Sequence, residues 1–162
     1  DFRYQSALGG GALLDCGGYV LKAAQLFLGD NVTVMTSSLL FEDEHDVDIF
    51  GSVTLQGESG LMMQASFGMD NSYKCELELW GSHGCLVSPR FFTPPSELEV
   101  ELTLRTQVEE RTLRVPKDDQ FFHMTERFSE CIHDFESAYQ ERQSMLAQMK
   151  LVSLIQSKNK LR

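Results

Sequence analysis

Three side chains capable of acid–base chemistry follow one another at helical spacing near the start of the sequence. Asp15, Tyr19 and Lys22 stand at i, i+4 and i+7, within a segment from Ala12 to Leu28 in which nearly every other position is apolar or small. In an α-helix this spacing places a carboxylate, a phenol and an amine along one narrow stripe. These groups need partners, because an unpaired buried polar group costs about 1–3 kcal/mol.

Two interpretations of this stripe stay open from the residues alone. In the structural one, Asp15 accepts hydrogen bonds from neighbouring backbone amides, while Tyr19 and Lys22 emerge at the helix edge. In the functional one, the stripe faces a ligand, and Gly11 and Gly18 on roughly the same side let that ligand or another backbone approach closely. Spacing alone favours the structural interpretation.

The residues around the stripe also resemble the start of the second domain of Gfo/Idh/MocA oxidoreductases, which depend on NAD(P). Asp1-Phe-Arg-Tyr and the later run Gly9-Gly-Gly-Ala-Leu-Leu-Asp-Cys-Gly-Gly-Tyr19 are similar to the family pattern GGG-x-LLD-x-G-x-(H or Y). Asp15 matches the family aspartate, and Tyr19 matches the catalytic His/Tyr position. The tyrosine version is most similar to the branch with nucleotide-sugar 3-ketoreductases and dihydrodiol dehydrogenases. Lys22 stands where many His-type members have a second Asp, which argues against an inositol-dehydrogenase type of site.

The resemblance implies a role for each of these residues in a complete enzyme. Tyr19 would donate a proton to the alkoxide that develops when a ketone receives a hydride. A phenol has a pKa of about 10 and needs a nearby cation for this work. The family supplies a lysine from a Glu-Lys-Pro motif, and Lys22 is a weaker candidate. Asp15 would orient the helix terminus or a substrate hydroxyl, and Arg3 would hold a phosphate or sugar oxygen.

The sequence contains no dinucleotide-binding motif and no Glu-Lys-Pro. Residues 9–11 are not a GxGxxG fingerprint, because no apolar strand precedes them and no third glycine follows at the required spacing. The family places this motif in a separate N-terminal Rossmann domain, absent from this chain. We therefore expect NAD or NADP in the complete enzyme and none bound by this domain alone. The four histidines lie in different predicted elements, and residues 42–46 read as a solvated acidic loop, so no metal site is predicted.

Composition limits the classes of protein that fit this chain. With 162 residues, 42% hydrophobic and 23% charged, we expect a single globular domain over residues 1–162. The net charge of −10 argues against nucleic acid and anionic membranes as partners. Four cysteines without a CxxC pair predict reduced thiols and a cytoplasmic protein. The first residue is Asp1, which suggests a fragment or an excised domain, although processing gives the same result.

Periodicity predicts the order of elements. A helix over 11–28 is followed by alternating strands and a helical tail that begins near 121 and breaks at 137–139. The strands are expected at 32–41, 47–56, 61–67, 73–80, 85–87, 98–105 and 111–115. This order predicts an α+β fold: an open, mostly antiparallel sheet of six to seven strands with helices packed on one face. The Phe and Met stripes of the tail are expected in the core.

The second face of this sheet must meet water or a partner. Met35, Leu39, Phe50 and Met62 are expected to share it, which is more apolar than a solvated face needs. Contact between subunits and a scatter of exposed apolar residues explain this equally well. The family uses this face to form oligomers, so the resemblance implies a homo-oligomer.

Two functions therefore stay open. The first is the substrate-binding and oligomerisation domain of an NAD(P)-dependent sugar oxidoreductase that is inactive alone, and the resemblance implies the nucleotide-sugar type. The second is a non-catalytic assembly or ligand-binding module with the same fold. The retained Asp15 and Tyr19 favour the first, and the missing cofactor motif favours the second. The sequence upstream of Asp1 distinguishes them.

Overall fold

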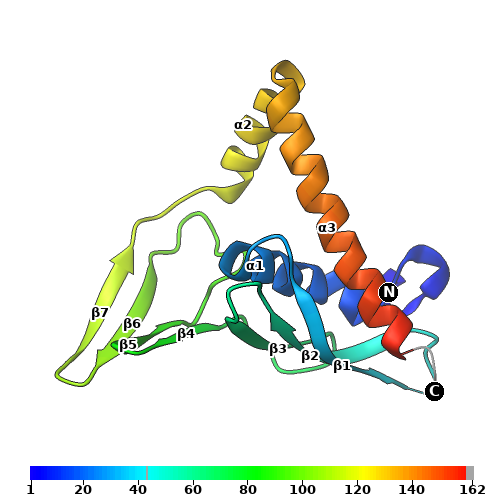
Figure 1. Ribbon diagram of the computed structural model, residues 1–162, viewed down its shortest axis with the longest axis horizontal. Helices are drawn as coiled ribbons and strands as arrows, with labels where there is room; N and C mark the ends of the chain where they lie inside the picture. Colours follow the sequence, from blue (N-terminus) through cyan, green and yellow to red (C-terminus); the bar gives the residue numbers. More distant parts are fainter. Residues whose placement is uncertain (43, 160–162) are drawn as a thin grey trace. The chain divides into compact units, whose positions relative to one another are not determined.

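The computed structural model describes residues 1–42 and 44–159, which divide into two compact units (Figure 1). The first unit contains residues 1–71 and the chain from Ala138 onward, and the second contains Ser72–Ser137. Each unit is described by itself. The expectation of a single domain over residues 1–162 stays a prediction.

The first unit is a three-stranded antiparallel sheet covered on one face by two helices (Figure 1). Two 3₁₀ turns and a π-helical segment lead into α1, and the strands follow in the order β1-β2-β3, before α3 returns from the end of the chain. The bounds are Phe2–Tyr4 and Ser6–Leu8 for the 3₁₀ turns, Leu13–Gly17 for the π-helical segment, Gly18–Leu28 for α1, Thr33–Phe41 for β1, Asp48–Gln56 for β2, Met62–Gly68 for β3 and Phe135–Asn159 for α3.

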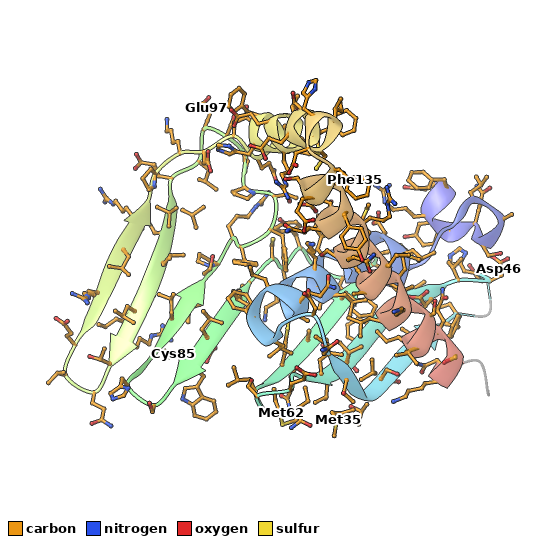
Figure 2. All side chains as sticks on the ribbon, turned by 45° about the horizontal axis from the view of Figure 1, so that its top comes forward. Met35, Asp46, Met62, Cys85, Glu97 and Phe135 are labelled. Atoms are coloured by element: carbon orange, nitrogen blue, oxygen red, sulfur yellow. The ribbon has the colours of Figure 1, made fainter. Side chains whose placement is uncertain are left out.

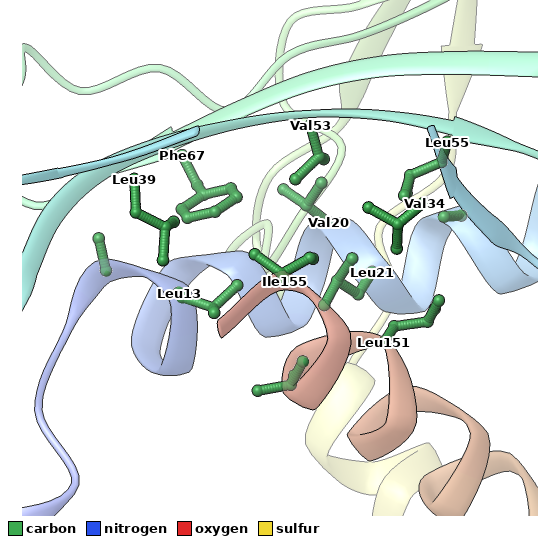
Figure 3. Packing of buried hydrophobic residues seen from close by; sticks show 13 residues of the cluster. Leu13, Val20, Leu21, Val34, Leu39, Val53, Leu55, Phe67, Leu151 and Ile155 are labelled. Atoms are coloured by element: carbon green, nitrogen blue, oxygen red, sulfur yellow. The ribbon is translucent and has the colours of Figure 1, made fainter. Parts of the chain in front are cut away.

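The core of the first unit lies between the helices and the inner face of this sheet (Figure 3). Leu21 of α1 and Ile155 of α3 are fully buried against Leu55 of β2. Val53 and Leu55 of β2 belong to the core cluster, as predicted, and Ile49 and the preceding Val47 are also buried.

Asp48 was expected on the outer face but is buried. The pairing of β1 with β2 shifts between Leu40 and Phe41, so that Phe41 pairs with Asp48, and the Asp48 carboxylate accepts the backbone N–H of Leu13.

A β-bulge in β1 overturns part of the predicted outer face. The pairing of β1 with β2 shifts between Val34 and Thr36, so Met35 is an extra residue. One extra residue reverses the facing of every position after it. Leu39, expected on the outer face, is therefore in the core, and Leu40 is 54% exposed instead.

The outer face of this sheet is mostly polar at its centre. Thr54 of β2 lies between Thr36 of β1 and Gln64 of β3, and the next row holds serines at 38, 52 and 66. Large apolar side chains are confined to its two ends. Met35 and Met62 are exposed near the end where β1 and β3 begin (Figure 2).

The second unit is a four-stranded antiparallel meander followed by a helix. The strands are β4 (Leu77–Gly81), β5 (Gly84–Ser88), β6 (Val100–Thr106) and β7 (Glu110–Val115), and the helix is α2 (Gln120–His133). One side of the meander is aliphatic, because the register aligns Leu79 with Leu86 and Leu104, and Leu102 with Leu113.

The α+β class and the antiparallel order of the strands are confirmed, and the seven strands of the described residues fall into two sheets. The helical break lies at Asp134, earlier than predicted, because its carboxylate accepts the backbone N–H of Ser137 and so caps α3. The Phe and Met stripe of α2 was expected in the core, but Phe128 is 68% exposed and no residue of α2 is buried. Within 1–42 and 44–159, no helix is both long and apolar enough to cross a membrane.

Candidate functional site

Tyr19 is the second residue of α1 and stands on the side of the helix that faces away from the core. Its side chain is 52% exposed, whereas the next two residues, Val20 and Leu21, are buried. A small molecule can therefore reach the phenol without any rearrangement of the core. This exposure fits both interpretations of the stripe, because Tyr19 emerges at the helix edge in the one and faces a ligand in the other.

Arg3 and Asp15, two of the residues singled out in the sequence, form an ion pair. Arg3 Nε donates to Asp15 Oδ2 at 3.0 Å, and Arg3 Nη1 donates to Asp1 Oδ2 at 3.1 Å. The backbone N–H of Arg3 also donates to Asp1 Oδ1 at 3.0 Å. The guanidinium is thus held between two carboxylates in a half-exposed position. The contribution of Asp1 was not expected, since no periodicity relates it to the helix.

The glycine run before the helix has a steric role. Gly10 and Gly11 turn the chain against the Arg3 segment, and the Gly11 N–H donates to the Arg3 carbonyl at 2.9 Å. A Cβ on Gly10 would lie 2.3 Å from that carbonyl oxygen. Gly11 has φ +118°, and a Cβ there would lie 2.5 Å from Asp48 Oδ1. The run therefore allows Arg3 and Asp48 to approach the start of the helix.

Asp48 fixes the start of the π-helical segment. Its Oδ2 accepts the backbone N–H of Leu13 at 2.7 Å, and the residue is only 8% exposed. Burial raises the pKa of this carboxyl, although the hydrogen bond from Leu13 opposes the shift. Strand β2 thus supplies the cap of a helix 35 positions earlier in the chain, which the sequence did not reveal.

The π-helical segment changes the geometry of the predicted stripe. Asp15 lies in residues 13–17, where the turn is wider than in an α-helix, while Tyr19 and Lys22 lie in α1. The i, i+4 spacing of Asp15 and Tyr19 therefore does not have its α-helical meaning. Nothing in the residue types of 13–17 announces this segment, although π-helical turns are frequent at functional sites.

Lys22 points to α3 and not to the Arg3–Asp15 pair. Its Nζ donates to Ser144 Oγ at 2.6 Å, and its side chain is otherwise exposed. One turn away, Gln25 Nε2 donates to the Ser144 carbonyl at 3.2 Å, and Gln148 Nε2 donates to the Gly18 carbonyl at 2.8 Å. Sequence reasoning missed this contact with α3 because it joins segments about 120 positions apart.

The thiol beside Asp15 is shielded. Cys16 Sγ lies 3.5 Å from the Gly68 carbonyl oxygen and 3.6 Å from Asp15 Oδ2. Burial, followed by the charge of Asp15, raises the pKa of the Cys16 thiol, which disfavours the nucleophilic thiolate. No group of three or more His, Cys, Asp or Glu side chains suited to a metal ion occurs in the described parts of the chain. The side chain of Tyr19, by contrast, is exposed.

The glycine run does not have the form of a dinucleotide site. It follows the 3₁₀ turn Ser6–Leu8 and not a strand, and the space beside Gly10 is filled by the Arg3 carbonyl. A Rossmann fingerprint needs a preceding strand and open space over its glycines for the pyrophosphate. Residues 9–11 therefore do not fit a nicotinamide dinucleotide.

The fold and the site define an α+β domain that carries an accessible phenol and a carboxylate-held arginine beside a glycine-rich turn. The chain belongs to the GFO/IDH/MocA family, whose C-terminal domain model matches residues 1–87.

Comparison with individual relatives agrees with this assignment. A dTDP-3,4-didehydro-2,6-dideoxy-alpha-D-glucose 3-reductase from Saccharopolyspora spinosa is 41% identical over 120 residues, which cover 74% of this chain and 36% of the relative. The enzyme of the same name from Actinomadura kijaniata is 33% identical over 157 residues, which cover 97% of this chain and 47% of the relative. The chain therefore spans less than half the length of these curated relatives.

A solved structure has the same fold over nearly the whole chain. The crystal structure of KijD10, a 3-ketoreductase from Actinomadura kijaniata in complex with NADP and TDP-benzene, superposes with a TM-score of 0.88 at 32% identity. The match covers 97% of this chain and 48% of KijD10.

Proposed function

We propose that this chain is the substrate-binding part of an NADP-dependent 3-ketoreductase that acts on a dTDP-linked keto sugar. The curated relatives are named for this activity, and KijD10 was solved with NADP and TDP-benzene. The observation that carries the proposal is the exposed Tyr19 side chain at the start of α1, in a family whose resemblance assigns a proton donor to this position.

Tyr19 is the proposed general acid. When a ketone of the substrate receives a hydride, its oxygen gains negative charge, and the Tyr19 hydroxyl donates a proton to it. The resulting phenolate takes a proton from solvent or from a neighbouring acid. The reduced cofactor NADPH, held outside this chain, would supply the hydride and become NADP⁺. This domain alone is expected to bind neither NAD nor NADP, because its glycine run lacks the form of a dinucleotide site.

Arg3, Asp15 and Lys22 are the proposed substrate-binding residues. Asp15 and Asp1 orient the guanidinium of Arg3, which binds a phosphate or sugar oxygen of the nucleotide sugar. The amine of Lys22, one turn after Tyr19, is held by Ser144 and adds positive charge near the phenol.

Replacement of Tyr19 by Phe tests the proposal in the full-length protein. We expect kcat to fall by about 10²–10⁴-fold, the usual contribution of a general acid, because only the hydroxyl is removed. Binding of NADP, measured by fluorescence titration, should stay unchanged. Tyr139→Phe is a matched control, since this tyrosine of α3 is 45% exposed. Full activity of Tyr19→Phe would remove Tyr19 from the mechanism.

The sequence encoded upstream of Asp1 tests the enzymatic assignment independently. A strand, a GxGxxG turn and a helix, followed by Glu-Lys-Pro, would supply the expected Rossmann domain and its lysine. A natural start at Asp1 would favour the second candidate, a non-catalytic assembly or ligand-binding module. The cytoplasmic location stays a prediction.

We also propose that the outer face of β1, β2 and β3 joins copies of the chain. Its central row, Thr36, Thr54 and Gln64, has short or uncharged side chains that allow close approach of a second sheet. Thr54→Arg should lower the mass measured by light scattering to that of a monomer. An unchanged oligomer, or a wild-type protein that is already monomeric, would contradict this part of the proposal.

A further inference from the structure

Helix α3 contacts the turn of α1 that carries Tyr19 through polar side chains. Ser144 and Gln148 stand at i and i+4 on α3, so they share one face of that helix. Opposite them lie Gly18, Lys22 and Gln25, the last of which is buried. We call these five residues the α1–α3 polar contact.

The contact is anchored by the core on one side. Leu151, Val152 and Ile155 follow Gln148 within two turns of α3 and are buried in the core cluster of the first unit (Figure 3). Apolar packing of these residues fixes the height and rotation of α3 against α1. The position of the Gln148 side chain is therefore set by the core and not by solvent.

The carbonyl that Gln148 contacts lies at a change of helix type. Gly18 is the first residue of α1 and directly follows the π-helical segment. Gln148 Nε2 donates to its oxygen at 2.8 Å, and Tyr19 is the next residue. A change from π to α hydrogen bonding shifts the backbone ladder by one residue. A backbone carbonyl oxygen has two lone pairs, so the Gly18 oxygen can accept from Gln148 in addition to a bond within the helix.

We propose that Gln148 is a positioning residue for Tyr19 that acts through the Gly18 carbonyl. By holding this peptide, it fixes the direction in which the Tyr19 side chain leaves the helix. The inference rests on the proposed function, in which Tyr19 must place its hydroxyl within hydrogen-bonding distance of the substrate oxygen. Misplacement of a catalytic group by about 1 Å can cost 10²-fold in rate.

The first experiment replaces Gln148 in the full-length enzyme. Gln148→Met keeps the length of the side chain and removes the donor, and we expect kcat to fall roughly tenfold while KM changes less than about twofold. Gln148→Glu is nearly isosteric but places a carboxylate against the carbonyl, so a larger loss of kcat is expected. The control is Gln143→Met on an exposed position of α3. Thermal melting checks that each variant is folded.

The second experiment separates positioning from a general structural role. In a Tyr19→Phe background, Gln148→Met should lower kcat little further, since the two substitutions remove the same contribution. The pH profile of kcat should also change only in the limb that reports the proton donor. An equal loss in both backgrounds, or no loss in the wild-type background, would overturn the inference.

These outcomes distinguish the two proposals. If Tyr19→Phe is fully active, the proposed function fails, and the role of Gln148 fails with it. If Tyr19→Phe is strongly impaired and Gln148→Met is as active as Gln143→Met, the proposed function stands and only the role of Gln148 is lost.

Discussion

The two units contain similar alternating strands but bury them to different extents. In the described parts of the chain, every buried hydrophobic side chain belongs to the first unit. In the second unit the aliphatic side of β4–β7 is only partly covered, and α2 leaves its large apolar residues exposed. Both units are built from antiparallel strand pairs, and they differ in how the side chains on those strands are packed.

This difference shows what an apolar pattern does and does not determine. Alternation sets which side of a strand is apolar, but burial requires a second layer whose shape fits it. In the first unit α1 and α3 provide that layer. Aliphatic surface as extensive as that of the second unit is typical of a surface that contacts another protein or domain. Five predictions test this contrast, from the largest expected effect to the smallest.

Truncation of one leucine in each unit should give very different losses of stability. Leu21→Ala removes a fully buried side chain and should lower the free energy of unfolding by about 3–5 kcal/mol. Leu113→Ala, on the partly exposed side of β7, should cost less than about 1 kcal/mol. Urea denaturation followed by circular dichroism measures both. Equal losses of stability would mean that Leu113 is packed as tightly in the second unit as Leu21 is in the first.

The bulge at Met35 predicts opposite outcomes for two adjacent leucines. Leu39 is 7% exposed, so Leu39→Ala should destabilise the protein by about 2–3 kcal/mol. Leu40→Ala should change stability by no more than about 0.5 kcal/mol. The same denaturation experiment measures the pair. A larger loss of stability for Leu40→Ala than for Leu39→Ala would mean that the bulge lies elsewhere in β1.

Removal of the carboxylate that caps the first helix should have a moderate effect. Asp48→Ala leaves the buried Leu13 N–H without its acceptor and should cost about 1–3 kcal/mol. Asp48→Asn keeps an acceptor oxygen and should cost less. If the two variants are equally stable, the hydrogen bond to Leu13 contributes little.

The difference in stability between wild type and Asp48→Asn is expected to depend on pH. Burial raises the folded-state pKa of Asp48 above its unfolded value of about 3.9. In the pH interval between these two pKa values, the folded state therefore binds more protons than the unfolded state. The contribution of Asp48 to stability therefore falls as pH rises through the interval and is constant above it. Relative to wild type, Asp48→Asn should gain stability as pH rises from about 3.9. A difference that is independent of pH would contradict the raised pKa.

The smallest effect is expected at His123, which lies on the exposed surface of α2. Its Nε2 lies 2.7 Å from Asp118 Oδ1 and its Nδ1 lies 3.2 Å from Glu126 Oε2, and these bonds raise its pKa above about 6.5. The stabilisation that protonated His123 gains from these two carboxylates is present below the unfolded-state pKa of the histidine. It is lost as pH rises through its folded-state pKa. Titration by NMR measures the pKa, and Asp118→Asn should lower it. An unchanged pKa in that variant would exclude the contact.

The sequence predicted those features that depend on local pattern. The alternation of Val47, Ile49, Val53 and Leu55 identified the inner face of β2, and turns ended β1, β2 and β3 close to the predicted positions. The helix that carries Tyr19 was predicted over 11–28, and the structure has helical turns over Leu13–Gly17 and Gly18–Leu28. Each of these predictions rests on a pattern whose residues lie within about ten positions of one another in the sequence.

Features that depend on contacts between distant segments were not predictable in the same way. The bulge at Met35 is defined by the pairing of β1 with β2, and the buried Asp48 bonds the backbone of Leu13, 35 positions earlier in the chain. The contact between Gln148 and Gly18 joins residues 130 positions apart. The helix break at Asp134 could have been predicted from the sequence, because Asp134 and Ser137 have the spacing of a helix cap.

The π-helical segment at Leu13–Gly17 separates the anchoring of the helix from the direction of its phenol. One residue of an α-helix corresponds to a rotation of about 100° around the axis. A π-helical turn accommodates an extra residue locally, so the buried side chains of α1 still face the core and Tyr19 still faces away from it. An insertion or deletion that the segment did not absorb would rotate Tyr19 together with Val20 and Leu21, and would therefore disturb the core as well as the phenol.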